Sequence, residues 1–166
     1  MKLEPDHDDV HAAAKSGDTD EVAALLSMDN RLTRTFDADG WSPLHLAAHY
    51  GHAATVDLLL HNNAPVDLRS TNAMTNTALH AALAGRQVKV AKILLDAGAD
   101  ANAQQHGGWT PLHSAAASGD REAIDLLLAR GAKPQLANDA GVTPAAFARE
   151  RGHGEIADYL DAKASG

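Results

Sequence analysis

One short pattern recurs along the chain at a nearly constant spacing, and this repetition limits the possible folds more than any other feature. The stretch GWSPLHLAAHYG at residue 40 is matched by TNTALHAALAGR at 75, GWTPLHSAAASG at 108 and GVTPAAFARERG at 141. A weaker copy, DDVHAAAKSG, starts at residue 8. The corresponding positions Val10, Leu44, Leu79, Leu112 and Ala145 are 34, 35, 33 and 33 residues apart. Such a period predicts stacked copies of one unit rather than a single globular core.

Each copy is predicted to contain two α-helices. The second segments are DEVAALL, ATVDLLL, KVAKILL, EAIDLLL and GEIADYL, and their apolar residues recur at spacings of three and four. This periodicity is typical of amphipathic helices and not of strands. Ser42-Pro43, Thr110-Pro111 and Thr143-Pro144 precede the first segments. A hydroxyl side chain caps the free amides of a helix, and proline is well tolerated at its first position. The sequence therefore predicts an all-α fold.

Residues suited to a left-handed backbone mark the turns. Between the two helices stand Gly17, Gly51, Gly119 and Gly152. After the second helix stand Gly98 and Gly131, replaced by Asn63 and Asp29, the next-best residue types at positive φ. We expect a left-handed turn at all of these positions.

The third copy departs from the pattern. Thr75 replaces the glycine that precedes the other first helices, and Arg86 replaces the inter-helix glycine, so we expect Gly85 to take the left-handed turn one residue early. The connection over residues 67–77 is expected to be longer or irregular.

The period, the Ser/Thr-Pro-Leu-His starts, the Leu-Leu-Leu segments and GADANA at 98–103 resemble ankyrin repeats over about residues 6–160. The resemblance implies a solenoid of stacked helix-turn-helix units, with β-hairpin-like finger loops such as 62–77, 97–110 and 130–143 that help line a concave surface. One domain over 1–166 is expected, with repeats at about 6–36, 37–69, 70–104, 105–137 and 138–166. Because the first and last copies are rich in polar residues, they are interpreted as caps of a complete, monomeric stack.

Three histidines raise the question of a metal site. His45, His49 and His52 are spaced to share one helix face, and imidazoles are good zinc ligands. The resemblance instead implies that His45, His80 and His113 bond near the capping hydroxyls of Ser42, Thr77 and Thr110. His52 occupies a position where other copies have Asp, which is typical of a helix start. We therefore expect no metal and no cofactor, and a histidine-dependent metalloprotein stays the least favoured alternative.

Composition argues against several further classes. The chain has 14 Lys and Arg against 22 Asp and Glu, and it lacks the basic stripe that nucleic-acid binding requires. No apolar run is long enough to span a membrane, and the segment MKLEPDHDDVH is unlike a secretory leader. The absence of cysteine fits a reducing compartment, so a cytoplasmic location is expected. With no nucleophile elbow, phosphate loop or HExxH motif, we expect no catalytic residues and no enzyme activity.

Positions that vary between copies are the candidates for partner contact, because residues that hold the repeats together must recur. The partner-binding residues predicted on this ground are Trp41, His49, Tyr50, Met74, Asn76, Trp109, Ser118, Glu150 and Arg151. Trp41 and Trp109 could equally pack against a neighbouring finger. The function predicted is a non-catalytic protein–protein interaction module that binds an unknown folded protein. An engineered scaffold without a natural partner is the alternative.

Overall fold

The computed structural model describes residues 7–166, which form two compact units, residues up to Ala99 and residues from Asp100 onward. The segment 1–6, including the residue at which the first repeat is expected to begin, lies outside the described residues. Within the described part, regular secondary structure consists of helices, and no strand is present. This confirms the all-α fold class.

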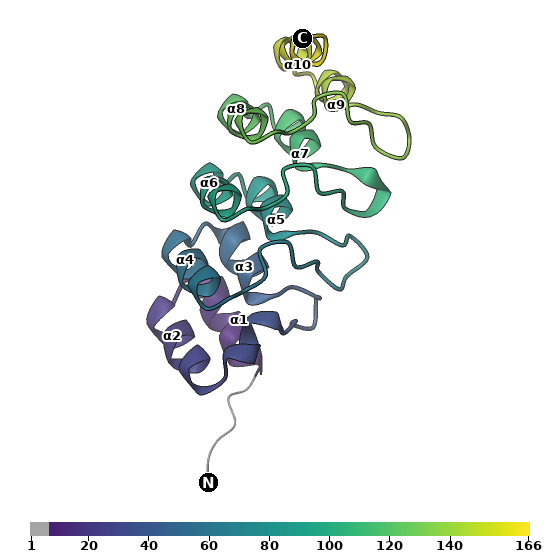
Figure 1. The fold of residues 1–166 in the computed structure, drawn as a ribbon. Helices are drawn as coiled ribbons and strands as arrows, with labels where there is room; N and C mark the ends of the chain where they lie inside the picture. The colour runs from purple at the N-terminus through teal and green to yellow at the C-terminus, as the bar shows by residue number, and fades with distance from the viewer. Residues whose placement is uncertain (1–6) are drawn as a thin grey trace. The chain divides into compact units, whose positions relative to one another are not determined.

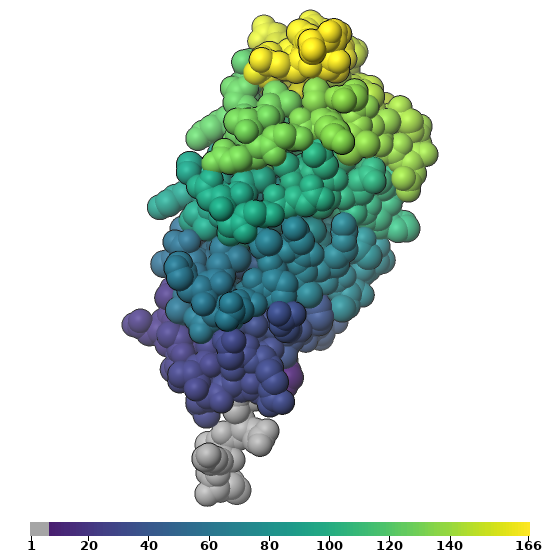
Figure 2. Space-filling model, viewed as in Figure 1, coloured from purple at the N-terminus to yellow at the C-terminus, as the bar shows by residue number. Residues whose placement is uncertain are grey.

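The first unit contains three helix pairs (Figure 1). Its elements are α1 (His7–Ser16), α2 (Thr19–Met28), the 3₁₀ helix η1 (Asn30–Arg34), α3 (Pro43–Tyr50), α4 (Ala53–His61), α5 (Ala78–Ala84) and α6 (Val88–Asp96). Helix α3 packs against α1 and α5, and α4 packs against α2 and α6, so the pairs stack in two layers. In Figure 2 the atoms of this unit lie in successive bands that follow the chain order.

The second unit repeats the arrangement with two helix pairs. Its elements are η2 (His106–Gly108), α7 (Pro111–Ala117), α8 (Arg121–Ala129), α9 (Pro144–Glu150) and α10 (Gly154–Ala164). Helix α7 packs against α8 and α9, and α9 packs against α10.

Leucines and alanines that recur between copies build both cores. Leu44, Leu79, Leu94, Leu112 and Leu127 are each at most 2% exposed. Alanines of the first helices, such as Ala48 and Ala82, are completely buried and let neighbouring helices approach closely. The recurring positions are therefore the structural ones, as the repetition predicts.

The helix starts follow the sequence prediction. Ser42, Thr77 and Thr110 each form a reciprocal capping box with the histidine three residues later. The histidine Nδ1 lies 2.7–2.9 Å from the hydroxyl oxygen in all three copies. Thr143 caps α9 alone, because Ala146 replaces the histidine there.

The fingers are hairpin turns, each closed by a backbone hydrogen bond across its base. In three of them the bond spans four residues: Asp37 N–H to Trp41 O, Gln105 N–H to Trp109 O and Asn138 N–H to Val142 O. In the third copy it spans six, from Ser70 N–H to Asn76 O. The prediction of a longer finger over 67–77 is confirmed.

Two turn predictions are wrong. Asp29 has φ −149° and not a positive φ, because the first copy continues directly into η1 and the Asp29 carboxylate caps that helix at Arg31 N–H. Gly85 has φ −80°, and Arg86 itself takes the left-handed conformation at φ 57°. Glycine at 85 has a different reason: a Cβ there would collide with the carbonyl oxygen of His49. Asn63 (φ 62°) and Thr75 (φ 50°) are left-handed, as expected.

Candidate functional site

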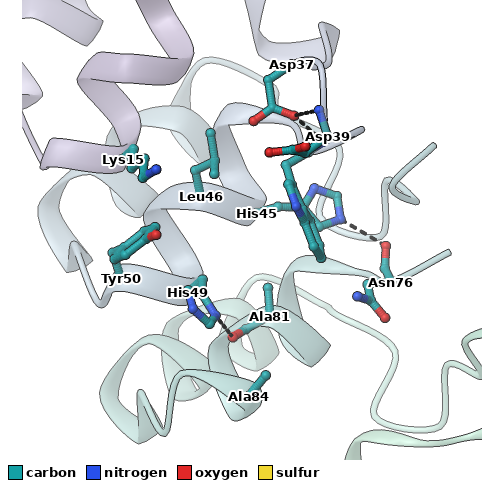
Figure 3. Close-up of a pocket in the computed structure, with 11 residues that line it drawn as sticks. Lys15, Asp37, Asp39, His45, Leu46, His49, Tyr50, Asn76, Ala81 and Ala84 are labelled. Carbon is teal, nitrogen blue, oxygen red and sulfur yellow. Dashed lines mark hydrogen bonds between the residues drawn. The ribbon is translucent and has the colours of Figure 1, made fainter. Parts of the chain in front are cut away.

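A groove of about 300 Å³ lies on the first unit, between α3, the finger that precedes it and α5. We call it the α3 groove (Figure 3). Its lining combines aromatic rings, two carboxylates and one ammonium group: Lys15, Asp37, Asp39, Trp41, His45, Leu46, His49, Tyr50, Asn76, Ala81 and Ala84. It brings together four of the predicted partner-binding residues: Trp41, His49, Tyr50 and Asn76.

Asp37 builds the finger side of the groove. Its Oδ1 accepts hydrogen bonds from the backbone N–H groups of Asp39 (3.0 Å) and Trp41 (2.8 Å), which fold the finger tip back toward α3. The half-buried Trp41 ring then rests on His45, with 5.5 Å between the ring centroids. Asn138 makes the same two backbone bonds, to Ala140 and Val142, in the second unit. A neutral amide oxygen at this position therefore holds the turn in the same way as the Asp37 carboxylate.

His45 forms the floor and is 1% exposed. Its Nδ1 faces the Ser42 hydroxyl, and its Nε2–H donates to the Asn76 carbonyl at 2.9 Å. Burial lowers the pKa of His45, and the Asn76 carbonyl and the Asp37 charge oppose that shift only in part. Burial likewise lowers the pKa of His113, whose Nε2–H donates to the Val142 carbonyl at 2.9 Å. Neutral imidazoles therefore join these helices to the fingers that follow them.

His49 and Tyr50 form the opposite wall, at the exposed end of α3. His49 Nδ1–H donates to the Ala81 carbonyl at 3.2 Å, and its ring meets the Tyr50 ring edge-on, with centroids 5.0 Å apart. The Tyr50 side chain is 46% exposed. The Lys15 ammonium lies 5.7 Å from the centroid of the Tyr50 ring (Figure 3).

The three histidines of the zinc hypothesis each bond to a backbone carbonyl. His45 bonds to Asn76 O, His49 to Ala81 O and His52, through Nε2 at 2.9 Å, to Lys15 O. His52 stands at the start of α4, as predicted, but its side chain does not cap the helix as Asp18 and Asp120 do in their copies. Across residues 7–166, no group of three His, Cys, Asp or Glu side chains is placed to hold a metal ion.

The other predicted residues lie away from this groove. Met74 is 46% exposed on the long finger and is not part of the lining. In the second unit, the half-buried Trp109 packs on Phe147 and His113, with ring centroids 4.6 and 5.3 Å away. Glu150 and Arg151 are exposed at the end of α9, and the Ser118 hydroxyl donates to backbone carbonyls of its own helix.

Sequence reasoning missed the polar half of the α3 groove. Lys15, Asp37 and Asp39 are not among the partner-binding residues predicted from the sequence, yet all three line the groove. A usable signal exists: Asp37 stands four residues before Trp41, as Asn138 stands four before Val142. Ala84 also contributes, because its small exposed side chain leaves the end of the groove open.

Comparison with known families decides the classification. The family model described as "Ankyrin repeats (3 copies)" matches residues 10–105 and 92–165. This chain belongs to the ankyrin-repeat family. Ankyrin repeats generally mediate protein–protein interaction, and the family is typically non-catalytic.

Several larger ankyrin-repeat proteins are similar to parts of the chain. SMC5-SMC6 complex localization factor protein 1 of Bos taurus is 35% identical over 96 residues, which are 58% of this chain and 9% of the relative. A transient receptor potential cation channel subfamily A member 1 homolog of Caenorhabditis elegans is 39% identical over 90 residues, 54% of this chain and 7% of its own length. GA-binding protein subunit beta-1 of Bos taurus is 45% identical over 58 residues, 35% of this chain and 15% of that protein.

The matched stretches therefore span only a small part of these relatives. In residues 7–166, no helix is both long enough and apolar enough to cross a membrane.

Proposed function

We propose that this ankyrin-repeat chain is a non-catalytic binding module that engages a folded protein partner through its first helices and fingers. The observation that carries the proposal is the gathering of non-recurring residues around one groove. Trp41, His49, Tyr50 and Asn76 vary between copies, and all four line the α3 groove. No requirement of the repeat architecture accounts for an exposed tyrosine at the end of α3.

Rigid placement of these side chains favours tight recognition. Asp37 holds the finger turn, His45 ties α3 to Asn76, and His49 is bonded to Ala81. Because these groups are already ordered, little conformational entropy is lost when a partner binds. Tyrosine and tryptophan are favoured at interface centres, because each buries a large area with few torsions to immobilise.

We further propose that the chain acts as a monomer in the cytoplasm. The polar, exposed residues of α10, including Asp161 and Lys163, support a monomer, and the lack of cysteine supports a reducing compartment. Light scattering coupled to size exclusion tests the first statement, and microscopy of the tagged protein tests the second.

The central experiment is affinity capture from a lysate of the source cell with quantitative mass spectrometry. The bait is compared with the double variant His49→Ala/Tyr50→Ala and with the control Met28→Ala, whose side chain is 61% exposed outside the groove. We expect a protein enriched by the parent and the control but lost with the double variant, while circular dichroism is unchanged. Equal capture by all three baits would contradict the role of the groove. Capture of nothing would favour the alternative of a scaffold without a natural partner.

A further inference from the structure

The α3 groove continues into a second hollow on the same unit. That hollow is lined by Asp8, His11, Ala12, Lys15, Asp37, Ala38, Asp39 and Leu46. Four of these residues, Lys15, Asp37, Asp39 and Leu46, also line the α3 groove. The two hollows therefore form one trough, which begins near α1, passes between the finger carboxylates and α3, and ends at Asn76.

The trough is rich in hydrogen-bond acceptors. Asp37 uses Oδ1 for the finger turn, and no described residue bonds to its Oδ2. The side chain of Asp39 makes no hydrogen bond or ion pair within residues 7–166. A ligand that lies in the trough therefore meets two carboxylates that the fold does not neutralise.

Unpartnered buried atoms support the same conclusion. Across residues 7–166, two buried side-chain polar atoms without a hydrogen-bond partner are found, His11 Nε2 and Asn76 Oδ1. Both residues line the trough, one toward each end. His11 is 4% exposed, and its Nδ1 bonds to the carbonyl of His7, while its Nε2 has no partner among the described residues. The trough thus offers the carboxylate oxygens of Asp37 and Asp39 to a ligand, and two residues of its lining also hold buried polar atoms without a partner.

The aromatic wall favours a cation among the possible donors. The chain's own Lys15 ammonium already lies over the Tyr50 ring at 5.7 Å, within the range of a cation–π contact. The half-buried Trp41 ring faces the same space. Residues 1–40 carry ten acidic and four basic residues, so their charge of −6 attracts a basic partner segment.

We infer that the trough binds an arginine side chain on an exposed basic segment of the partner protein. This inference rests on the proposed function and specifies the partner's chemistry. A guanidinium is planar, carries five donors and stacks on aromatic faces, so it can donate to the Asp37 and Asp39 carboxylates while it covers Trp41 or Tyr50. An ammonium is a compact point charge and cannot do both. In this arrangement Lys15 competes with the arginine for the Tyr50 face and repels it.

The sign of the Lys15 effect separates a cationic occupant from an anionic one. Removal of Lys15 strengthens the binding of an arginine, whereas it would weaken the binding of a carboxylate or phosphate. Asp37→Asn removes a charge without loss of the finger turn, since Asn138 makes the same two backbone bonds. Asp57→Asn is the matched control, because Asp57 is exposed on α4 outside the trough.

The test is an NMR titration of the isotope-labelled full chain with capped pentapeptides that differ only in a central Arg, Lys, Gln or Glu. The chain has two tryptophans, so the Trp41 indole N–H reports on the trough and the Trp109 indole serves as an internal control. We expect a saturable shift of the Trp41 signal with the Arg peptide and weaker binding of the other three. Lys15→Ala should raise the affinity about threefold to fivefold, and Asp37→Asn should lower it by a similar factor, as for single exposed charge pairs. Asp57→Asn should leave it unchanged.

Three outcomes would overturn the inference: no shift of Trp41 with the Arg peptide, equal or tighter binding of the Lys or Glu peptide, or weaker binding after Lys15→Ala. Its failure is distinguishable from failure of the proposed function. If a partner is captured through His49 and Tyr50 but the Arg peptide causes no shift, the proposed binding function stands and only the arginine inference fails. If the capture experiment fails, the proposed binding function fails, regardless of the result of the peptide titration.

Discussion

The Nε2–H of His45 donates to the backbone carbonyl of Asn76, 31 residues later, at 2.9 Å. Through the same ring, Nδ1 faces the Ser42 hydroxyl that caps α3. One buried side chain therefore joins the start of its own helix to the finger of the next copy. His113 makes the equivalent pair of contacts with Thr110 and Val142. The stability of each unit should depend strongly on these imidazoles.

His45→Ala should lower the free energy of unfolding by about 2–4 kcal/mol. The variant loses the hydrogen bonds of the ring to Ser42 and Asn76, leaves the Asn76 carbonyl with only the Ser70 N–H as donor and creates a cavity. Urea denaturation followed by circular dichroism measures the change. The control is His61→Ala, because His61 is exposed and bonds only to the carbonyl of Asp57 on its own helix. Its effect should stay within about 0.5 kcal/mol, and equal losses in the two variants would contradict the bridging role.

The same histidines should make stability depend on pH. Burial lowers the pKa of both His45 and His113 below the ordinary value of 6.5. Below pH 6.5 the unfolded chain binds protons that the folded chain does not, so the stabilisation present above that pH is lost as the pH falls. Each group contributes a slope of up to about 1.4 kcal/mol per pH unit until the folded-state pKa is reached. Urea unfolding between pH 7.5 and 5.5 should show the decline, and His113→Gln should reduce its slope. A flat profile would mean that these rings protonate in the folded state.

Thr75→Gly should stabilise the first unit. Thr75 holds φ 50°, a conformation that is costly for a β-branched residue, where other fingers have glycine. Relief of this strain should raise the free energy of unfolding by about 0.5–1 kcal/mol after the added flexibility of the unfolded chain is subtracted. The reciprocal variant Gly141→Thr should destabilise, since Gly141 has φ 77° with open space around it. Thermal unfolding of both variants measures the two effects. A lower melting temperature for Thr75→Gly would contradict the conclusion that the Thr75 backbone is strained.

Gly85→Ala should destabilise although its backbone is right-handed. An added Cβ would meet the carbonyl oxygen of His49, so α3 and α5 would have to separate. We expect a loss of about 1–3 kcal/mol, as for overpacking of a core. The matched change Gly154→Ala, at a position with open space at the start of α10, should be neutral or slightly stabilising. Chemical denaturation of the two variants measures the difference. Equal stabilities would contradict the close packing of residue 85 against the His49 carbonyl.

Trp109→Ala and Tyr50→Ala should behave differently. Trp109 is half-buried against Phe147 and His113, so its removal should cost about 1–3 kcal/mol of stability. Tyr50 is 46% exposed, and its removal should cost less than about 1 kcal/mol while it weakens partner binding. Calorimetric melting of each variant separates a packing residue from a partner contact. A larger loss for Tyr50→Ala would reverse the two roles.

Much of the fold follows from the repeated pattern. The spacing of Leu44, Leu79 and Leu112 predicts buried helix positions, and the Ser/Thr-x-x-His pairs predict the capping boxes seen at all three sites. The two additional residues before Asn76 predict the longer finger. These features are local, or they recur with the period, so they can be seen in the sequence without knowledge of the packing.

Asp29 and Gly85 show the limit of that reasoning. Both residue types tolerate a positive φ, so a left-handed turn was expected at both positions. In the structure Asp29 instead caps η1, and residue 85 must be glycine because the His49 carbonyl lies too close for a Cβ. Both effects depend on contacts with segments whose positions the period does not specify.

By itself, the sequence determined the helices, their caps and the recurring core, because these depend on local spacing and composition. The tertiary structure alone decided that Lys15, Asp37 and Asn76 meet Trp41 and Tyr50 in one groove. Side chains of three successive copies converge there, and their distances depend on how closely the alanine-lined helices stack and where each finger turns. Such distances are properties of packing, and no spacing along the chain encodes them.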